Sequence, residues 1–236
     1  LIMQSRDNVE IETASLNIFR KNMVMGVFAT VSVATEEMAP FKKLEDLNIP
    51  VVFFDRVPEE KGFYTVCLPD ALAAKIAAEA IIEKKKKNLL ALFGHPHLSI
   101  SKVRCQALVD TFKEQSPDTK ITIHYPEQSA PSKEIALNAL TSSEPPDVIF
   151  CMGDLILIGV MKAIHKLNLK VPEDVAVIGI SNGFIPTMYN PVITYVETSG
   201  YKLGKLSFAQ MLGRLKGEDI SENVCVESML VKGGSL

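Results

Sequence analysis

Residues 146–165 read PDVIFCMGDLILIGVMKAIH, and this stretch decides the fold class. A proline-rich turn leads into the apolar run Val148–Met152, which is typical of a fully buried strand. From Asp154 to about Leu167 the sequence then predicts a helix. A buried strand followed directly by a helix is the repeating half of an α/β fold with parallel strands.

The same alternation of strand and helix continues along the rest of the chain. Further strands are expected at Met23–Thr30, Ile49–Asp55, Phe63–Leu68, Asn88–Phe93, Lys120–Tyr125, Val175–Ile180, Tyr195–Glu197 and Asn223–Val231. Further helices are expected at Asn8–Lys21, Pro40–Leu47, Ala71–Ile82 (capped by Asp70), Ser99–Lys113, Ser132–Thr141 (opened by a Ser N-cap) and Tyr201–Leu215. The pattern predicts the α/β class, with parallel sheets flanked by helices on both faces.

Composition excludes several classes of protein. The 236 residues are 47% hydrophobic and 22% charged, which is unlike a disordered chain. The longest apolar run, Leu155–Met161, is far shorter than the roughly 18 residues that a membrane span needs. A net charge of −3 argues against binding nucleic acid through bulk charge. The basic run Lys84–Lys87 is interpreted as a solvated helix end, with a nucleic-acid patch as the alternative.

Cysteine usage and the first residues suggest a cytoplasmic protein. Cys67, Cys105, Cys151 and Cys225 are widely spaced without a CxxC pair, so they are expected to be reduced and mostly buried. No signal peptide follows Leu1, which is interpreted as a trimmed start.

The sequence lacks the common catalytic and cofactor-binding motifs. It contains no GxxxxGK[ST] loop, no GxGxxG after a strand and no GxSxG elbow, so no cofactor is expected. His95 and His97 form a weak candidate metal pair, and a polar loop explains them better. The remaining candidates are polar residues at the carboxyl ends of strands, where open α/β sheets bind ligands.

Four stretches, in this order, point to one family. They are Ile49–Arg56 (IPVVFFDR), Asn88–Phe112 with its glycine loop and Arg104, Pro146–His165, and Val171–Gly183 (VPEDVAVIGISNG). Together they resemble the effector-binding core of lactose-repressor (LacI/GalR-type) transcription regulators. The resemblance implies two interleaved lobes like those of periplasmic sugar-binding proteins, joined by three chain crossings.

Carried onto this sequence, the resemblance sets the limits of the two lobes. The N-terminal lobe is expected to hold residues 1–67 and 200–221, and the C-terminal lobe residues 68–199 and 222–236. The crossings are expected near Val66–Asp70, Glu197–Tyr201 and Gly217–Asn223. Leu1–Ser5 matches the family's second strand, so the first strand, the first helix and the DNA-binding headpiece are expected to be missing from this sequence.

The resemblance also implies a function. The chain is expected to be the effector-sensing domain of a DNA-binding repressor, in which a small sugar-like molecule in the interlobe cleft controls operator binding. It is expected to be cytoplasmic and homodimeric, to need no membrane or cofactor, and to catalyse no reaction. Operator DNA would be bound by an upstream helix-turn-helix. The alternative is an extracytoplasmic sugar-binding protein of a transporter, and a third reading is an enzyme on this fold.

Five residues are candidate effector contacts by the same resemblance: Asp55, Arg104, Asp154, Ser181 and Ser32. Asp55 is expected to accept bonds from sugar hydroxyls, with a cap or an Arg56 salt bridge as its alternative role. Arg104 offers several fixed donors to the effector. Two departures stand out, since Gly153 replaces the family's usual Asn and Ser181 replaces an effector-binding Asp. They suggest an effector that is less hydroxylated, or anionic.

Overall fold

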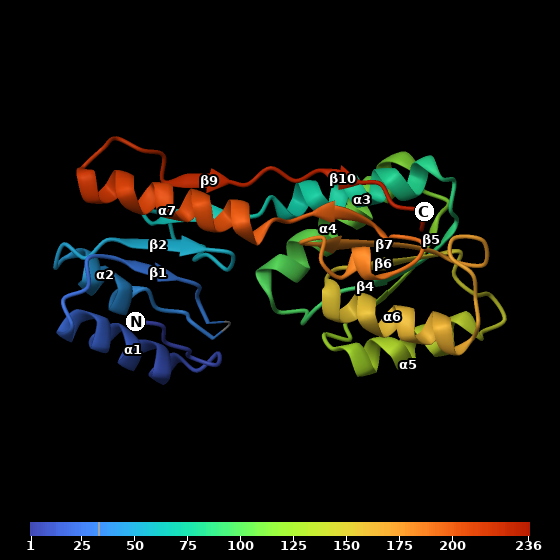
Figure 1. Ribbon diagram of the computed structural model, residues 1–236, viewed down its shortest axis with the longest axis horizontal. Helices are drawn as coiled ribbons and strands as arrows, with labels where there is room; N and C mark the ends of the chain where they lie inside the picture. Colours follow the sequence, from blue (N-terminus) through green and yellow to red (C-terminus); the bar gives the residue numbers. More distant parts are fainter. Residues whose placement is uncertain (33) are drawn as a thin grey trace. The chain divides into compact units, whose positions relative to one another are not determined.

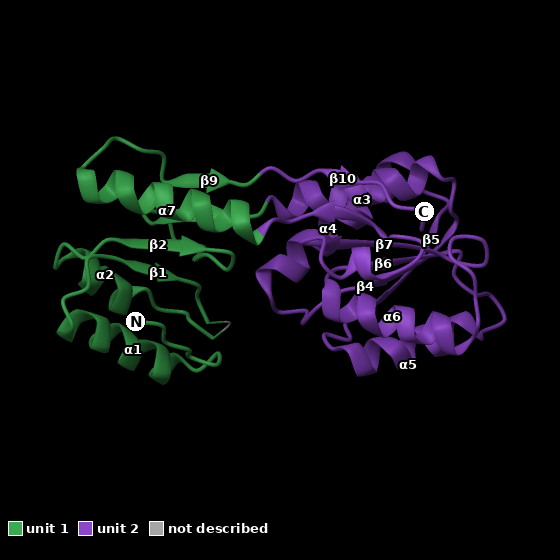
Figure 2. Ribbon diagram, viewed as in Figure 1, with its two compact units in different colours: residues 1–68, 200–226 green, residues 69–199, 227–236 purple. Residues whose placement is uncertain are grey.

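The computed structural model describes residues 1–32 and 34–236 (Figure 1). The chain forms two compact units (Figure 2): unit 1 contains residues 1–68 and 200–226, and unit 2 contains residues 69–199 and 227–236. Residues 222–226, which the sequence analysis assigned to the C-terminal lobe, lie in unit 1. They do so because strand β9 (Asn223–Cys225) pairs in parallel with β3 (Tyr64–Cys67) of that unit.

Unit 2 is built on a six-stranded sheet with the strand order β10-β8-β7-β6-β4-β5. The strands are β4 (Asn88–Leu92), β5 (Lys120–His124), β6 (Val148–Cys151), β7 (Ala176–Ser181), β8 (Thr194–Glu197) and β10 (Leu230–Val231). All neighbouring strands run parallel except β10, which is antiparallel to β8. The predicted α/β fold with parallel-dominated sheets is therefore confirmed.

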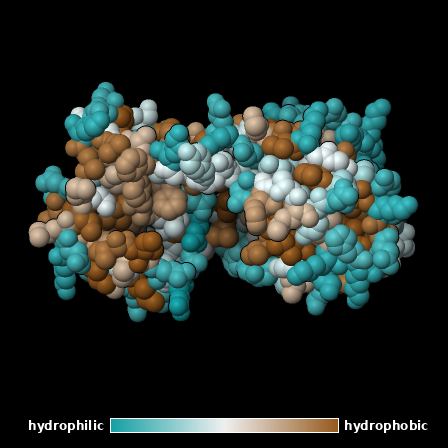
Figure 3. Space-filling model, in the orientation of Figure 1, coloured by the Kyte–Doolittle hydropathy of each residue, from teal (hydrophilic) through white to brown (hydrophobic). Residues whose placement is uncertain are grey.

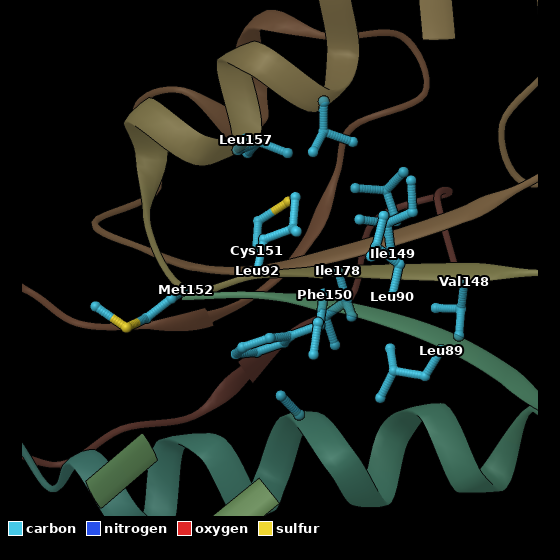
Figure 4. Packing of buried hydrophobic residues seen from close by; sticks show 14 of the residues in the cluster. Leu89, Leu90, Leu92, Val148, Ile149, Phe150, Cys151, Met152, Leu157 and Ile178 are labelled. Atoms are coloured by element: carbon cyan, nitrogen blue, oxygen red, sulfur yellow. The ribbon is translucent and has the colours of Figure 1, made fainter. Parts of the chain in front are cut away.

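Helices cover both faces of this sheet, as the continuous apolar strands predict. Helices α3 (Asp70–Glu83) and α4 (Ser99–Gln115) lie on one face, and α5 (Ser129–Leu140) and α6 (Asp154–Lys166) lie on the other (Figure 1). Successive side chains of β6 point to opposite faces. Phe150 points to the face that α3 covers, whereas Cys151 points to the face where Leu157 of α6 lies (Figure 4). Both residues are fully buried. A short 3-10 turn, η1 (Pro186–Met188), follows β7.

The order of the strands creates a topological switch point between β4 and β6. These two strands are neighbours in the sheet. The chain leaves β4 through α4 toward β5 at one edge, but it leaves β6 through α6 in the opposite direction, toward β7. Connections that diverge in this way open a crevice beside the carboxyl ends of the two strands, where ligands of open α/β sheets bind.

Unit 1 contains a smaller sheet with the order β1-β2-β3-β9. Strands β1 (Val27–Ala29) and β2 (Val51–Phe54) precede β3, and the helices are α1 (Val9–Lys21), α2 (Ala39–Glu45) and α7 (Gly200–Lys216). Val51 and Phe53 of β2 pack in one apolar cluster with residues of α1 and α2. Val52, on the other face of the same strand, packs in a second cluster with residues of α7. The small sheet is thus also covered on both faces.

An ion pair fastens α7 to the rest of unit 1. The Arg214 guanidinium donates to both carboxylate oxygens of Glu45 at 2.6 Å each, and to the Val51 carbonyl at 3.0 Å. It also lies 4.2 Å from the centroid of the Tyr64 ring. Two parallel bonds and a stacked ring fix the guanidinium more firmly than a lysine would be fixed, since a lysine carries only one ammonium group.

Unit 1 carries much exposed apolar surface, which Figure 3 shows as brown patches. Its exposed side chains include Leu1, Ile2, Val9, Ile11, Met23, Met25 and Phe28.

The expectation that Leu1–Ser5 forms a strand is wrong, because this segment has no ladder partner in the part of the chain that the structure describes. A strand needs a neighbour for its backbone donors and acceptors. Among the described residues, no helix is both long and apolar enough to cross a membrane.

Three expected element limits also need correction. Asp70 lies inside the first turn of α3, and the N-cap residue is Pro69. Helix α5 begins at Ser129, so Ser132 is not its N-cap, and the Ser132 hydroxyl instead donates to the Gln128 carbonyl at 2.6 Å. The expected strand Asn223–Val231 is divided into β9 and β10, because its first part pairs in unit 1 and its last part in unit 2.

Two helical glycines give a matched test of this packing. A Cβ at Gly159 of α6 would lie 2.3 Å from the Ser129 carbonyl oxygen of α5, whereas a Cβ at Gly204 of α7 would meet nothing within 4 Å. We expect Gly159→Ala to lower the free energy of unfolding by about 1–3 kcal/mol through overpacking. Gly204→Ala should raise it by about 0.5–1 kcal/mol through helix propensity. Urea unfolding measures both changes, and two changes of the same sign would contradict the packing described.

Candidate functional site

Arg104 is the central charged residue of unit 2. Its side chain projects from α4 and only 5% of the residue is exposed. The guanidinium donates to Asp70 from Nε at 2.8 Å, and its Nη2 lies 2.6 Å from the same carboxylate oxygen. Nη1 donates to the Met152 carbonyl at 2.9 Å, directly after β6. These bonds join α3, α4 and the carboxyl end of β6.

The ion pair with Asp70 compensates for the burial of the Arg104 charge and occupies only part of its N–H donors. A charge that is removed from water needs a partner and hydrogen bonds, and Asp70 and Met152 provide them. Removing one partner of such a pair typically costs about 3–5 kcal/mol. A guanidinium carries five N–H donors, and the bonds within the described part of the chain use three of them. Arg104 therefore retains donors for a ligand.

Asp154 lies in the first turn of α6, next to the same strand end. It does not cap the helix, because the N-cap residue is Gly153 and no side-chain capping bond forms. Burial raises the pKa of the Asp154 carboxyl above its ordinary value, and a hydrogen bond from the Ser181 hydroxyl opposes that shift. Ser181 is buried at the end of β7 and also accepts a bond from the Gly183 N–H at 3.0 Å.

The conformation of Gly183 keeps this turn compact. Its φ of +94° is a backbone conformation that side-chain-bearing residues rarely adopt, and an added Cβ would lie 2.6 Å from the Tyr195 hydroxyl. Ser181, which replaces the family's usual Asp, is thus held by the bond from the Gly183 N–H. The Ser181 hydroxyl donates to the Asp154 carboxyl and lowers its pKa, so Ser181 affects the site through Asp154.

Two buried polar atoms at these strand ends lack a partner in the described part of the chain, namely Asp154 Oδ1 and Ser101 Oγ. Ser101 is fully buried on α4 and lies beside the end of β4. A Cβ at Gly94 would be 3.2 Å from Ser101 Oγ and 3.1 Å from Met152 Cε, so these groups lie at one place. Buried polar atoms are nearly always bonded, so each exception needs an explanation.

The structure thus brings Arg104, Asp154 and Ser181 together at the switch point, beside Ser101 of the candidate loop at 95–101, and sequence reasoning missed one neighbour, Asp70. Ser101 precedes Arg104 by three positions on α4, and that spacing places both residues on one helix face. The spacing was available in the sequence. No local signal identifies Asp70 as the partner of Arg104, because the two residues are 34 positions apart.

The two candidates of unit 1 lie at the ends of β1 and β2. Ser32 is buried, its N–H donates to Glu12 Oε1 at 2.9 Å, and its hydroxyl accepts from the Ala34 N–H at 3.4 Å. Glu12, a buried carboxylate of α1 that the sequence analysis overlooked, also accepts from the Thr35 hydroxyl at 2.5 Å. Asp55 is exposed and has a φ of +60°, a conformation that Asp tolerates better than most residues.

Arg56 does not form the expected alternative salt bridge with Asp55. Its Nη1 donates to Asp7 at 2.7 Å instead. The positive φ of Asp55 marks a sharp turn at the end of β2. The Asp55 carboxylate is therefore not engaged by its neighbour.

Within the described residues, no cluster of three His, Cys, Asp or Glu side chains has the arrangement of a metal site. The imidazole rings of His95 and His97 have centroids 5.3 Å apart, and the His97 N–H donates to His95 Nδ1 at 3.3 Å. That bond occupies one of the ring nitrogens in a local turn. The loop reading of this pair fits the contacts seen.

Known proteins share the sequence pattern and the fold of this chain. A family model described as a periplasmic binding protein-like domain matches residues 78–236. The chain belongs to this family. The ribose operon repressor of Halalkalibacterium halodurans is 24% identical over 216 residues, which is 92% of this chain. The chain spans 63% of that repressor's length. The resemblance to lactose-repressor-type cores is thereby confirmed.

Solved structures share the fold at low identity. A LacI family transcriptional regulator from Enterococcus faecalis V583 with bound ribose superposes with a TM-score of 0.81 at 19% identity, covering 96% of this chain and 82% of the regulator. A periplasmic solute binding protein of an ABC transporter from Actinobacillus succinogenes 130z, with bound D-allose, gives 0.84 at 21% identity, covering 98% and 85%. Regulators and transport proteins therefore share this architecture, and fold alone does not separate them.

The raised pKa of Asp154 gives a pH test of the site. The folded pKa lies above the unfolded value of about 3.9, so the folded state binds the proton more tightly. This contribution to stability is fully present below about pH 3.9 and is lost as the pH rises through the folded pKa. Asp154→Asn removes the proton but keeps an acceptor for Ser181. We expect the unfolding free energy of the wild type, relative to this variant, to fall as the pH rises.

Ser181→Ala provides the matched variant for that experiment. It removes the hydrogen bond that lowers the pKa of Asp154, so the pH window of the decline should extend upward. Urea unfolding from about pH 4 to about pH 7 measures all three proteins. A wild-type curve that runs parallel to the Asp154→Asn curve would show that Asp154 is not buried as described.

Proposed function

We propose that this chain is the effector-binding core of a LacI-type transcriptional repressor, and that it binds a small sugar or sugar derivative. The observation that carries the proposal is the group of polar side chains at the switch point of unit 2. Arg104 has donors to spare, while Asp154 Oδ1 and Ser101 Oγ are buried without a partner. Donors and acceptors that converge in this way suit the hydroxyl groups of a sugar.

Charge favours a neutral effector over the anionic one considered from the sequence. The positive charge of Arg104 already faces the Asp70 carboxylate at 2.6 Å. Asp154 adds a second carboxyl at the same strand ends, and burial raises its pKa, because a charged group loses solvation there. Among these groups, an anion would meet the Asp70 and Asp154 carboxyls as well as the Arg104 guanidinium. A hydroxyl group can instead donate to Asp154 and accept from Arg104 at no electrostatic cost.

The arrangement suits binding better than catalysis. The switch-point group contains one guanidinium, two carboxyls and two hydroxyls, and the Asp154 carboxyl and Ser181 hydroxyl are bonded to each other without a histidine. Acyl transfer through a covalent intermediate needs a nucleophile with an oriented base, which these residues do not form. We therefore infer that the effector leaves the site unchanged. The named curated relative is a repressor, in agreement with this view.

The proposed partners follow from the repressor reading. Operator DNA would be bound by a helix-turn-helix upstream of these residues in the cytoplasm, and the core would form a homodimer. The exposed apolar side chains of unit 1 support a dimer, since large exposed apolar patches mark interaction surfaces. The alternative, a sugar-binding protein of a transporter, has the same fold. The stretch VPEDVAVIGI at Val171–Ile180 favours the regulator.

Effector binding can be tested with a thermal-shift panel of pentoses, hexoses and purine bases on the full-length protein. A true effector at a concentration 100 times its Kd should stabilise the protein by about 2.7 kcal/mol. Arg104→Lys should weaken binding by about tenfold or more, because one ammonium cannot bond Asp70, the Met152 carbonyl and a ligand together. Lys102→Ala, an exposed residue on the same helix, serves as the control. Equal affinity of Arg104→Lys and Lys102→Ala for the effector would show that Arg104 does not contact it.

Operator binding separates the repressor from the transport protein. We expect the full-length protein to retain an operator upstream of its own gene, and the effector to change that affinity by about 5–150-fold. Arg104→Lys should keep the DNA affinity but lose the response. Mobility-shift titrations with and without the sugar measure both quantities. Sugar binding without any specific DNA binding would favour the transporter alternative.

A further inference from the structure

Two cysteines from distant parts of the chain meet in unit 1. Cys67 ends β3 and Cys225 ends β9, and the two residues are direct register partners in a parallel strand pair. Their Sγ atoms lie 2.8 Å apart, although the residues are separated by 158 positions. The expectation that the four cysteines are mostly buried is wrong, because Cys225 is exposed and both Cys67 and Cys105 are partly exposed.

The backbone at this position suits a disulfide. Neighbouring strands lie about 4.8 Å apart, and bridged cysteines have Cα atoms about 4.4–6.8 Å apart. Register partners on parallel strands also point to the same face of the sheet. The two sulfurs would have to approach by less than about 1 Å to reach the disulfide length of about 2.05 Å. Closure therefore needs only small side-chain rotations.

The other two cysteines are placed differently. Cys151 is fully buried in the core of unit 2, and desolvation raises the pKa of its thiol, so the thiol is unreactive. Cys105, on α4, has a hydroxyl neighbour instead of a thiol, since its Sγ lies 3.6 Å from the Tyr125 hydroxyl. Among the described cysteines, the pair Cys67–Cys225 alone combines exposure with a second sulfur at contact distance.

We propose that Cys67 and Cys225 are a redox-active thiol pair, which a peroxide or a small-molecule disulfide converts into an intramolecular disulfide between β3 and β9. With hydrogen peroxide, the exposed Cys225 thiolate attacks one oxygen and the O–O bond breaks. The departing hydroxide takes up a proton, so the products are a sulfenic acid and one water. The Cys67 sulfur then attacks the sulfenic sulfur. The S–S bond forms while the S–O bond breaks, and the departing hydroxide takes up a proton as the second water.

The bridge would lie next to two connections between the units. Leu68 follows Cys67 and Val226 follows Cys225, and each is the last residue of its segment in unit 1. A disulfide there fixes the spacing of these two outgoing segments where they leave the sheet. It also closes a very long loop, which restricts the unfolded chain and stabilises the folded one. This proposal does not depend on the identity of an effector.

Thiol–disulfide exchange with oxidised glutathione tests the proposal on the intact protein. In the wild type, Cys225 should be attacked first and Cys67 should then displace the glutathione, leaving an intramolecular bridge. Cys67→Ser should stop at the mixed disulfide between Cys225 and glutathione. Trapping of free thiols, digestion without reductant and mass spectrometry identify these products. Cys105→Ser, the matched control, should form the bridge as fast as the wild type.

A stability measurement provides the second readout. The bridged wild type should unfold at a higher temperature than the reduced protein, and a reductant should reverse that increase. Neither Cys67→Ser nor Cys225→Ser should respond to the oxidant in this way. Stable glutathione adducts on the wild type, or oxidation at Cys105 ahead of the pair, would overturn the proposal.

Discussion

The buried ion pair between Arg104 and Asp70 is the constraint on which the site of unit 2 depends. Three elements supply its groups, since Asp70 begins α3, Arg104 comes from α4, and the accepting carbonyl of Met152 follows β6. A guanidinium at this depth is tolerated only when its partners are held in place. The switch point provides that arrangement, because the adjacent strands β4 and β6 send their chains in opposite directions. The topology therefore determines where the partners of the buried charge are held.

The remaining polar groups are ordered by the same strand ends. The Met152 carbonyl accepts a hydrogen bond from Arg104. Two residues later, the Asp154 carboxyl accepts one from the Ser181 hydroxyl, which itself accepts from the Gly183 N–H. Hydrogen bonds within the chain thus fix one side of the site. Asp154 Oδ1 and Ser101 Oγ have no partner in the part of the chain that the structure describes. Such preorganisation means that a ligand need not order these side chains when it binds. The ordering cost is met during folding.

The fold was largely predictable from sequence because its strands are continuous apolar runs that few other structures can bury. The site was predictable only in part. Arg104, Asp154 and Ser181 follow from the motifs, but Asp70 looked like a helix cap, since acidic residues at that position usually are. A contact across 34 residues depends on how α3 packs on α4, which no local pattern encodes. The pairing of β9 with β3 is a long-range contact of the same kind. Because no local pattern predicts it, the expected lobe limit at residue 221 was wrong.

The motifs that carry the family resemblance mostly serve the backbone. Asp147 of the stretch at 146–165 accepts from the N–H groups of Lys87 and Asn88, and so joins the starts of β4 and β6. Asp174 of VPEDVAVIGI accepts from the Lys170 N–H and closes the turn before β7. These carboxylates fix the amino ends of strands, whereas ligands bind at the carboxyl ends. The residues at the carboxyl ends can therefore differ without loss of these backbone bonds, and Gly153 and Ser181 stand at those ends of β6 and β7.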